Sequence, residues 1–338
     1  MNKVKIWLSE LRAPFLTGTI IPITLGTAIA WVRNSVFNPV FFVLALIGGI
    51  LVHLGANVVN DYFDYKSGTD TVNKEFVRPF TGGSRSIPSG QLTPREVLSG
   101  AIVLLTLATI IGLYFTFVVG YFVLVLVAVG LFSAYFYTGR PFNLVAKGVG
   151  EAIVGLNFGL LMTLGAFYVQ TGALSIEPLV AAVPVALLIT AILYINAFQD
   201  YSADKAVGKN TWVVRLGREK ASIAYAGMMY ATYAAILLAV LFRVIPVYTL
   251  IALVTLPLTV KSIVNARQFH SSSFQLALSN ALTIVVHLFT GILLILGYLL
   301  SAFAPLTAGF TAILSAAIIC IAVTFLLFKK IAYGKKPL

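Results

Sequence analysis

Residues 53–70 read HLGANVVNDYFDYKSGTD, and they close a long apolar run with two asparagines and three aspartates. Asn57 and Asp61 are four residues apart, as are Asn60 and Asp64, so on a helix these pairs share one side. Charged groups near the end of a membrane helix are costly and are usually functional. The alternative is a solvated helix end followed by a turn, because Asn, Asp, Ser and Gly also favour turns.

The rest of the chain is apolar enough for a membrane protein. Its 338 residues are 59% hydrophobic and only 10% charged, and the mean hydropathy is +0.98. A soluble domain carries roughly 25% charged residues, so a soluble enzyme is excluded. The single cysteine excludes a disulfide framework, and three histidines at unrelated spacings argue against a zinc site.

Ten apolar segments approach the length of about 20 residues that a helix needs to span a bilayer. With the N-terminus inside, the loops place all of the 23 basic residues except Arg33 and Arg243 on the inner side, as the positive-inside rule requires. We therefore expect an all-α, polytopic transmembrane helical bundle in a cell membrane, with the N-terminus and the Asp-rich loops cytoplasmic. The net charge of +12 then belongs to the face that meets anionic headgroups or an anionic substrate, and no nucleic acid partner is expected. The segments are residues 15–32, 40–60, 97–117, 120–137, 149–169, 178–198, 221–242, 245–262, 276–300 and 306–328.

The acidic motif occurs a second time, at the end of segment 178–198. Asn196, Asp200 and Asp204 follow one another at intervals of four and form a stripe over two helical turns. Asn60 and Asp64 make the same N-x-x-x-D step in the first half. The chain thus reads as two related four-helix units. An acidic cluster repeated on one membrane face favours a functional site over turn chemistry.

Two facing clusters of carboxylates suit magnesium, which takes oxygen ligands and is usually shared with substrate phosphates. Such a site binds a diphosphate and neutralises the charge that develops as it leaves. The expected metal ligands are Asn60, Asp61, Asp64, Asp70, Asp200 and Asp204. We expect Asp64 and Asp200 to be catalytic. Nearby basic and amide side chains are expected to bind substrate, the basic ones through charge-assisted hydrogen bonds to phosphate: Arg12, Arg78, Arg85, Lys147, Lys209, Asn57 and Asn196.

Two of the expected substrate contacts have a simpler alternative. Arg12 stands just before the first apolar segment, where it would also serve as an interfacial anchor. His53 lies two helical turns before Asn60 on the same side and is a candidate for orienting an aromatic acid. It would equally suit a buried histidine that is hydrogen-bonded within the bundle.

These motifs resemble those of the UbiA superfamily of membrane prenyltransferases, which carry N-D-x-x-D-x-x-x-D in the first half and D-x-x-x-D in the second. The variant NDYFDYKSGTD is similar to the branch that prenylates 1,4-dihydroxy-2-naphthoate in menaquinone synthesis. The resemblance covers about residues 8–300, and it is extended by three loop segments: RPFTGGSR (residues 78–85), RPFNLVAKGVGE (residues 140–151) and GKNTWVVRLG (residues 208–217).

The resemblance implies a helical bundle in which two magnesium ions hold a polyprenyl diphosphate between the motifs. It implies transfer of the polyprenyl group to an aromatic acceptor through an allylic cation, with dihydroxynaphthoate losing its carboxyl group. It also implies one domain over residues 1–338 with nine core helices, so that residues 305–330 would form an added tenth helix. Gly68 stands where the family has the last Asp of the first motif, which leaves Asp70 as either a metal ligand or a loop residue.

Two other functions remain as alternatives. One is a prenyltransferase for another acceptor, such as 4-hydroxybenzoate, haem, chlorophyllide or a glycerol-phosphate lipid. The other is a cation-coupled transporter. A transporter should carry its acids near the bilayer midplane, whereas the motif aspartates fall at the inner ends of their helices. A CDP-alcohol phosphotransferase would need a D-G-x-x-A-R element, which the sequence lacks.

Overall fold

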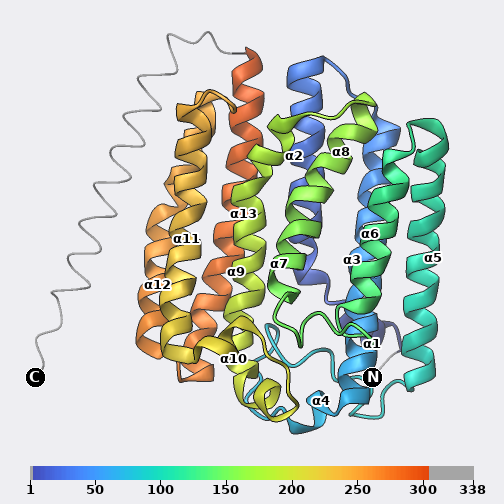
Figure 1. Ribbon diagram of the computed structural model, residues 1–338, viewed down its shortest axis with the longest axis vertical. Helices are drawn as coiled ribbons and strands as arrows, with labels where there is room; N and C mark the ends of the chain where they lie inside the picture. The colour runs from blue at the N-terminus through green and yellow to red at the C-terminus, as the bar shows by residue number, and fades with distance from the viewer. Residues whose placement is uncertain (1–2, 304–338) are drawn as a thin grey trace, which may run out of the picture.

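A computed structural model describes residues 3–303, and every regular element in that range is helical. Long helices stand side by side in one bundle (Figure 1). The short elements are α1 (Lys3–Glu10), η1 (Ala13–Leu16), α4 (Thr69–Val72) and α10 (Trp212–Leu216). The long rods are α2 (Thr17–Asn34), α3 (Pro39–Ser67), α5 (Pro94–Val118), α6 (Phe122–Phe136), α7 (Gly150–Val154) continued by η2 (Gly155–Leu161) and α8 (Met162–Thr171), α9 (Ile176–Ala206), α11 (Arg218–Leu241), η3 (Val247–Thr255) continued by α12 (Leu256–Phe269), and α13 (Ser273–Phe303).

Seven of these rods are long and apolar enough to cross a membrane. They are α3, α5, α7 to α8, α9, α11, η3 to α12, and α13, while α6 is a shorter apolar helix. The expected all-α, multi-pass membrane architecture is thereby confirmed for the described residues. The count of nine core helices stays a prediction, and the expected helix at 305–330 lies outside the described residues.

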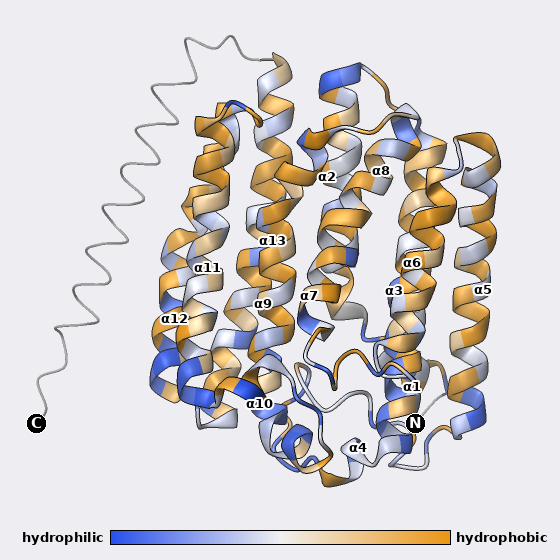
Figure 2. Cartoon of the chain, viewed as in Figure 1, coloured by the Kyte–Doolittle hydropathy of each residue, from blue (hydrophilic) through white to orange (hydrophobic). Residues whose placement is uncertain are grey.

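Polar and apolar residues separate along the bundle axis. Apolar residues dominate the middle of the long helices, and hydrophilic residues gather at the end where α4 and α10 lie (Figure 2). Large apolar side chains such as Ile102, Ile110 and Phe117 on α5 are exposed on the outside of the bundle. An apolar exterior is what a bilayer requires, because lipid tails solvate these side chains and the helices satisfy their own backbone groups.

Helix α3 carries Asn60, Asp61 and Asp64 of the first motif, because it continues to Ser67 rather than ending near residue 60 as expected. Asn38 caps its first turn by accepting from the backbone N–H groups of Val40 and Phe41. Gly68 ends the helix in the left-handed region, with φ of 81°. The chain then turns directly into α4, so the residues just after Gly68 return towards the interior of the bundle.

Small residues allow several helices to come into close contact, both within the second half of the chain and between the halves. At Gly155 and Gly159 of η2, an added Cβ would collide with Thr190 and with the backbone of Ala186 on α9. Gly26 of α2 packs equally tightly against α8. Such close approach is the usual basis of helix association in membranes, where apolar burial gives no advantage over lipid.

Hydroxyl groups join the helices on the other side of α9. The Tyr225 hydroxyl lies 2.7 Å from Ser262 Oγ and 2.6 Å from Thr283 Oγ1, and it thereby links α11, α12 and α13. Thr255 and Thr290 add a further hydroxyl pair between η3 and α13, at 2.8 Å. These bonds set the register of apolar helices that could otherwise slide.

Candidate active site

A cavity of about 450 Å³ lies inside the bundle. Its wall combines the ends of both acidic motifs with loop residues and with the apolar faces of α5, α6 and α8. Most of the expected site residues line it, although they come from distant parts of the chain: Arg12, His53, Asn57, Asn60, Asp64, Asp70, Asn196, Asp200, Asp204 and Lys209.

Four expected site residues do not line the cavity, namely Asp61, Arg78, Arg85 and Lys147. The Arg78 guanidinium donates to the Ser84 carbonyl oxygen at 3.0 Å. Arg85 lies over the Phe76 ring, 4.5 Å from its centroid. These basic side chains contact loop residues, so their assignment to substrate stays a prediction.

Asp61 is turned away from the cavity and holds Arg12. Its side chain is buried, pairs with the Arg12 guanidinium, and accepts the backbone N–H of Ser84 at 3.0 Å. Gly83 passes so close that an added Cβ would lie 2.9 Å from both Arg12 Nη2 and Asp61 Oδ1. Arg12 lines the cavity, so its pair with Asp61 fixes where the guanidinium lies, and the assignment of Asp61 as a metal ligand stays a prediction.

Asp64 forms an ion pair with Lys209 in the cavity wall. Lys209 Nζ lies 2.5 Å from Asp64 Oδ1, and Asn60 Nδ2 donates to Asp64 Oδ2 at 3.1 Å. Burial by itself would lower the pKa of the Lys209 ammonium, but the charges of Asp64 and Asp204 more than offset it, and the pKa is raised. Lys209 therefore stays charged, and it joins carboxylates of the two motifs.

Asp200 of the second motif is engaged by the loop that follows the first motif. Asn73 Nδ2 donates to Asp200 Oδ1 at 2.6 Å. This contact joins the end of α4 to α9, so the two halves of the site meet through it. Asn73 was not anticipated, because only the tertiary structure brings it beside the second motif.

Asp70 lies in the cavity wall because of the turn at Gly68. The left-handed backbone of Gly68 ends α3, and α4 then carries Asp70 to the cavity, where its side chain is 5% exposed. Burial raises the pKa of Asp70 to about 7, and the negative charge of Asp64 adds to this effect. A carboxyl group in such a position suits a cation, which would restore the charged form.

The chemistry of these donors fits magnesium. Carboxylate and amide oxygens from both motifs line one cavity, and oxygen ligands are what magnesium prefers. As placed in residues 3–303, however, no three His, Cys, Asp or Glu side chains form a group that could hold a metal ion. Lys209 occupies an oxygen of Asp64, and Asn73 occupies one of Asp200. An ion bound by these aspartates would take over the charge neutralisation that Lys209 now provides.

Further polar residues line the cavity that the sequence motifs did not reveal. Tyr137, Glu151, Asn157 and Thr211 all belong to its wall. Glu151 Oε1 accepts the backbone N–H of Trp212 at 2.7 Å and so fixes the loop that carries Lys209. In the sequence, Asn157 is visible only as a polar residue within an apolar segment, whereas Glu151 and Thr211 fall in the loop segments at residues 140–151 and 208–217.

Beyond the polar end, the cavity continues as an apolar arm between α3, α5, α6 and α8. Five glycines of these four helices belong to its wall: Gly48, Gly49, Gly112, Gly130 and Gly165. The wall residues on these helices include Ala108, Gly112, Phe115, Val123, Leu126, Val127, Gly165 and Val169. A charged group at the polar end with a hydrocarbon chain in the arm would match this division.

Comparisons with known proteins agree with the motifs. The model of the UbiA prenyltransferase family matches residues 19–273. The 1,4-dihydroxy-2-naphthoate octaprenyltransferase of Escherichia coli is 30% identical over 316 residues, covering 90% of this chain and 98% of that protein. The 2-carboxy-1,4-naphthoquinone phytyltransferase of Synechocystis is 28% identical over 294 residues, covering 87% and 93%.

The fold is also that of a solved structure. A UbiA homolog from Archaeoglobus fulgidus, bound to DMAPP and Mg²⁺, superposes with a TM-score of 0.55 at 15% identity, covering 96% of this chain and 99% of that one. At this identity the likeness concerns the fold. The family model, in contrast, extends over most of the sequence. The chain belongs to the UbiA prenyltransferase family.

Proposed function

We propose that this prenyltransferase transfers a polyprenyl group from polyprenyl diphosphate to 1,4-dihydroxy-2-naphthoate, in menaquinone synthesis, with magnesium as cofactor. The observation that carries the proposal is the single cavity in which both acidic motifs line one end and an apolar arm forms the other. The names of the similar proteins support a naphthoate-type acceptor. The Mg²⁺ and DMAPP bound to the Archaeoglobus homolog support the donor and the metal.

The polar end supplies the charges that a diphosphate needs. Asn60, Asp64, Asp70, Asp200 and Asp204 would hold magnesium, which when bound neutralises charge on the departing diphosphate. Lys209 and Arg12 line the same space and would donate charge-assisted hydrogen bonds to phosphate oxygens. If Lys209 donates to the phosphates, magnesium would replace its ammonium as the cation beside Asp64.

The transfer needs no nucleophilic side chain. The allylic C–O bond breaks and its electron pair leaves with the diphosphate. The ring carbon that bears the carboxylate attacks the allylic carbon, and a C–C bond forms. The carboxylate then departs as carbon dioxide, and the electrons of its bond restore the aromatic ring. The apolar walls from α5, α6 and α8 keep water from the allylic cation.

We also propose that the N-terminus and the Asp-rich loops face the cytoplasm, with the chain forming one domain. The hydrophilic end of the bundle carries α4 and α10 together with the ends of both motif helices (Figures 1 and 2). The distribution of Lys and Arg between the loops supports this orientation by the positive-inside rule.

The direct test is product analysis with purified protein in detergent. Prenyl diphosphate, magnesium and one acceptor at a time are incubated, and the product mass is measured. We expect a decarboxylated product, a prenyl-1,4-naphthalenediol, from dihydroxynaphthoate, and its loss when EDTA removes the metal. Turnover of 4-hydroxybenzoate, haem, chlorophyllide or a glycerol-phosphate lipid instead would show that the acceptor assignment is wrong.

We expect the space in the apolar arm to limit the length of the prenyl chain that the enzyme accepts. Ala108 is a small residue of α5 in its wall, 5% exposed. Phenylalanine at this position would fill space that a long tail needs, and overfilling a packed apolar site costs about 1–3 kcal/mol. We therefore expect Ala108→Phe to raise the KM for long polyprenyl diphosphates about tenfold or more. The KM for dimethylallyl diphosphate should change little. Kinetics with donors of increasing length measure the effect. Equal losses for short and long donors would contradict this path for the tail.

A further inference from the structure

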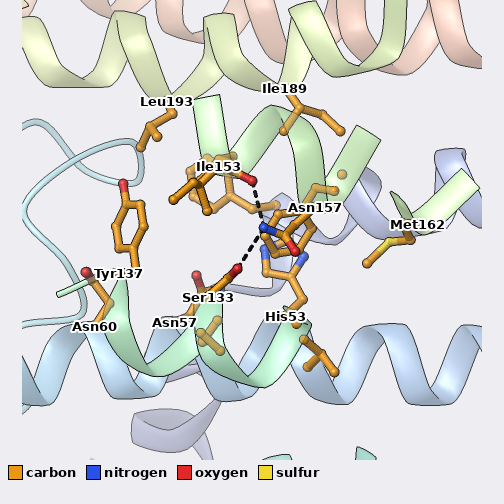
Figure 3. Close-up of a pocket in the computed structure, with 18 of the residues that line it drawn as sticks. His53, Asn57, Asn60, Ser133, Tyr137, Ile153, Asn157, Met162, Ile189 and Leu193 are labelled. Atoms are coloured by element: carbon orange, nitrogen blue, oxygen red, sulfur yellow. Dashed lines mark hydrogen bonds between the residues drawn. The ribbon is translucent and has the colours of Figure 1, made fainter. Parts of the chain in front are cut away.

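We propose, on the basis of the function above, that Asn157 and Ser133 recognise a hydroxyl group of the aromatic acceptor. Asn157 lies on η2, the middle part of the rod from α7 to α8, and Ser133 lies on α6. Both line the cavity, on the part of its wall that also includes His53 (Figure 3). Neither residue belongs to an acidic motif.

The backbone around Asn157 is unusual. Residues Gly155–Leu161 form a π-helix inside an otherwise α-helical rod. Single π-turns are uncommon and occur often at functional sites, because the extra residue changes which side chains face a given direction. Here the π-helix begins at Gly155, which is packed against α9, and Asn157 follows in the cavity wall.

The hydrogen bonds of Asn157 determine what it can offer a ligand. Its Nδ2 donates to the Ile153 carbonyl oxygen at 2.9 Å and to Ser133 Oγ at 3.0 Å (Figure 3). A carbonyl oxygen only accepts, so the atom beside it is the amide nitrogen, and both amide protons are used. The remaining atom, Oδ1, only accepts.

Ser133 offers the complementary group. Its hydroxyl oxygen accepts from Asn157, and its own proton has no acceptor among the described residues. The pair therefore presents one acceptor and one donor to the cavity. A phenolic O–H beside a second oxygen, as in a hydroxynaphthoate, satisfies both atoms, whereas a methyl ether leaves Oδ1 unpaired.

The surroundings suit an aromatic ring. His53 is held by Thr19, whose Oγ1 lies 2.8 Å from Nδ1, and its ring packs on Phe158 with centroids 4.6 Å apart. His53 precedes Asn60 by seven residues on α3, which corresponds to about 10 Å along the helix. An acceptor anchored at this level leaves the diphosphate end free for the donor.

The experiment measures the inhibition constants of two compounds that compete with the acceptor, 1-hydroxy-2-naphthoate and its 1-methoxy analogue. We expect the wild-type enzyme to bind the hydroxyl compound about tenfold more tightly, the equivalent of roughly 1.4 kcal/mol. Asn157→Leu should reduce this preference to near unity, while KM for prenyl diphosphate changes less than about twofold, because only the hydroxyl contact is lost. Thr171→Val on the same rod, outside the cavity wall, is the control and should keep the preference.

Ser133→Ala is a second variant, and it should lower the preference in the same direction. No preference in the wild-type enzyme, or a preference retained in Asn157→Leu, would overturn the inference. If the leucine variant fails to fold, Ser133→Ala takes its place, and a preference fully retained in that variant would also overturn the inference. Failure of the proposed function would look different, because the wild-type enzyme would then form no prenylated product from dihydroxynaphthoate.

Discussion

Alanine in place of Asp64 or Asp200 is expected to abolish most of the magnesium-dependent prenyl transfer, with a loss of at least about two orders of magnitude in kcat. Each residue comes from a different motif, and both line the polar end of the cavity. Removing either carboxylate takes away an oxygen that would hold the ion neutralising the diphosphate. Product formation at saturating donor and acceptor, measured over a range of magnesium concentrations, gives the effect.

These two variants should remain folded. Asp64→Ala removes the ion-pair partner of Lys209, but the charges of Asp204 and Asp200 remain beside that ammonium, and loss of one carboxylate relieves repulsion within the cluster, so we expect only a small fall in the unfolding temperature. Glu219→Gln is a matched control that removes an exposed carboxylate on α11 and should keep full activity. Full magnesium-dependent turnover by either alanine variant would contradict the assignment of the site.

Alanine in place of Asp61 should instead act mainly on stability. The Asp61 side chain is 4% exposed and is the partner of Arg12, which is 24% exposed. Breaking such a pair leaves a partly buried guanidinium without its counter-charge and the Ser84 N–H without its acceptor. We expect a loss of about 3 kcal/mol in the free energy of unfolding, measured by thermal or denaturant unfolding in detergent.

A second substitution separates the two roles of Asp61. In the double variant Asp61→Ala with Arg12→Met, no charge is left unpaired, so part of the stability should return although activity does not. The alternative is that Asp61 ligates metal, as its place in the motif suggests. A stable Asp61→Ala protein that requires much more magnesium for half-maximal turnover would establish that alternative.

The different surroundings of Asp61 and Asp64 could not be predicted from the sequence. Both belong to the motif at the end of α3, and both were expected to ligate metal. Three residues along a helix separate them by about 300°, which does not say which one faces the cavity. The answer depends on Arg12 and Ser84, which reach Asp61 from other elements.

The membrane class, the helical fold and the family could all be predicted from the amino-acid sequence. These depend on composition, on the length of apolar runs and on motifs whose residues lie close together in the chain. It also identified most of the residues that line the polar end of the cavity. Local periodicity carries this information, because a helix places residues four apart on one side.

The contacts of these residues, and which of them reach the cavity, depend on the tertiary structure. The left-handed turn at Gly68 carries Asp70 into the cavity wall, and packing of α9 against η2 accompanies the π-helix that presents Asn157. Lys209 and Asn73 meet the motifs across long stretches of chain. Such contacts follow from the folding of distant segments against one another, and no local pattern encodes them.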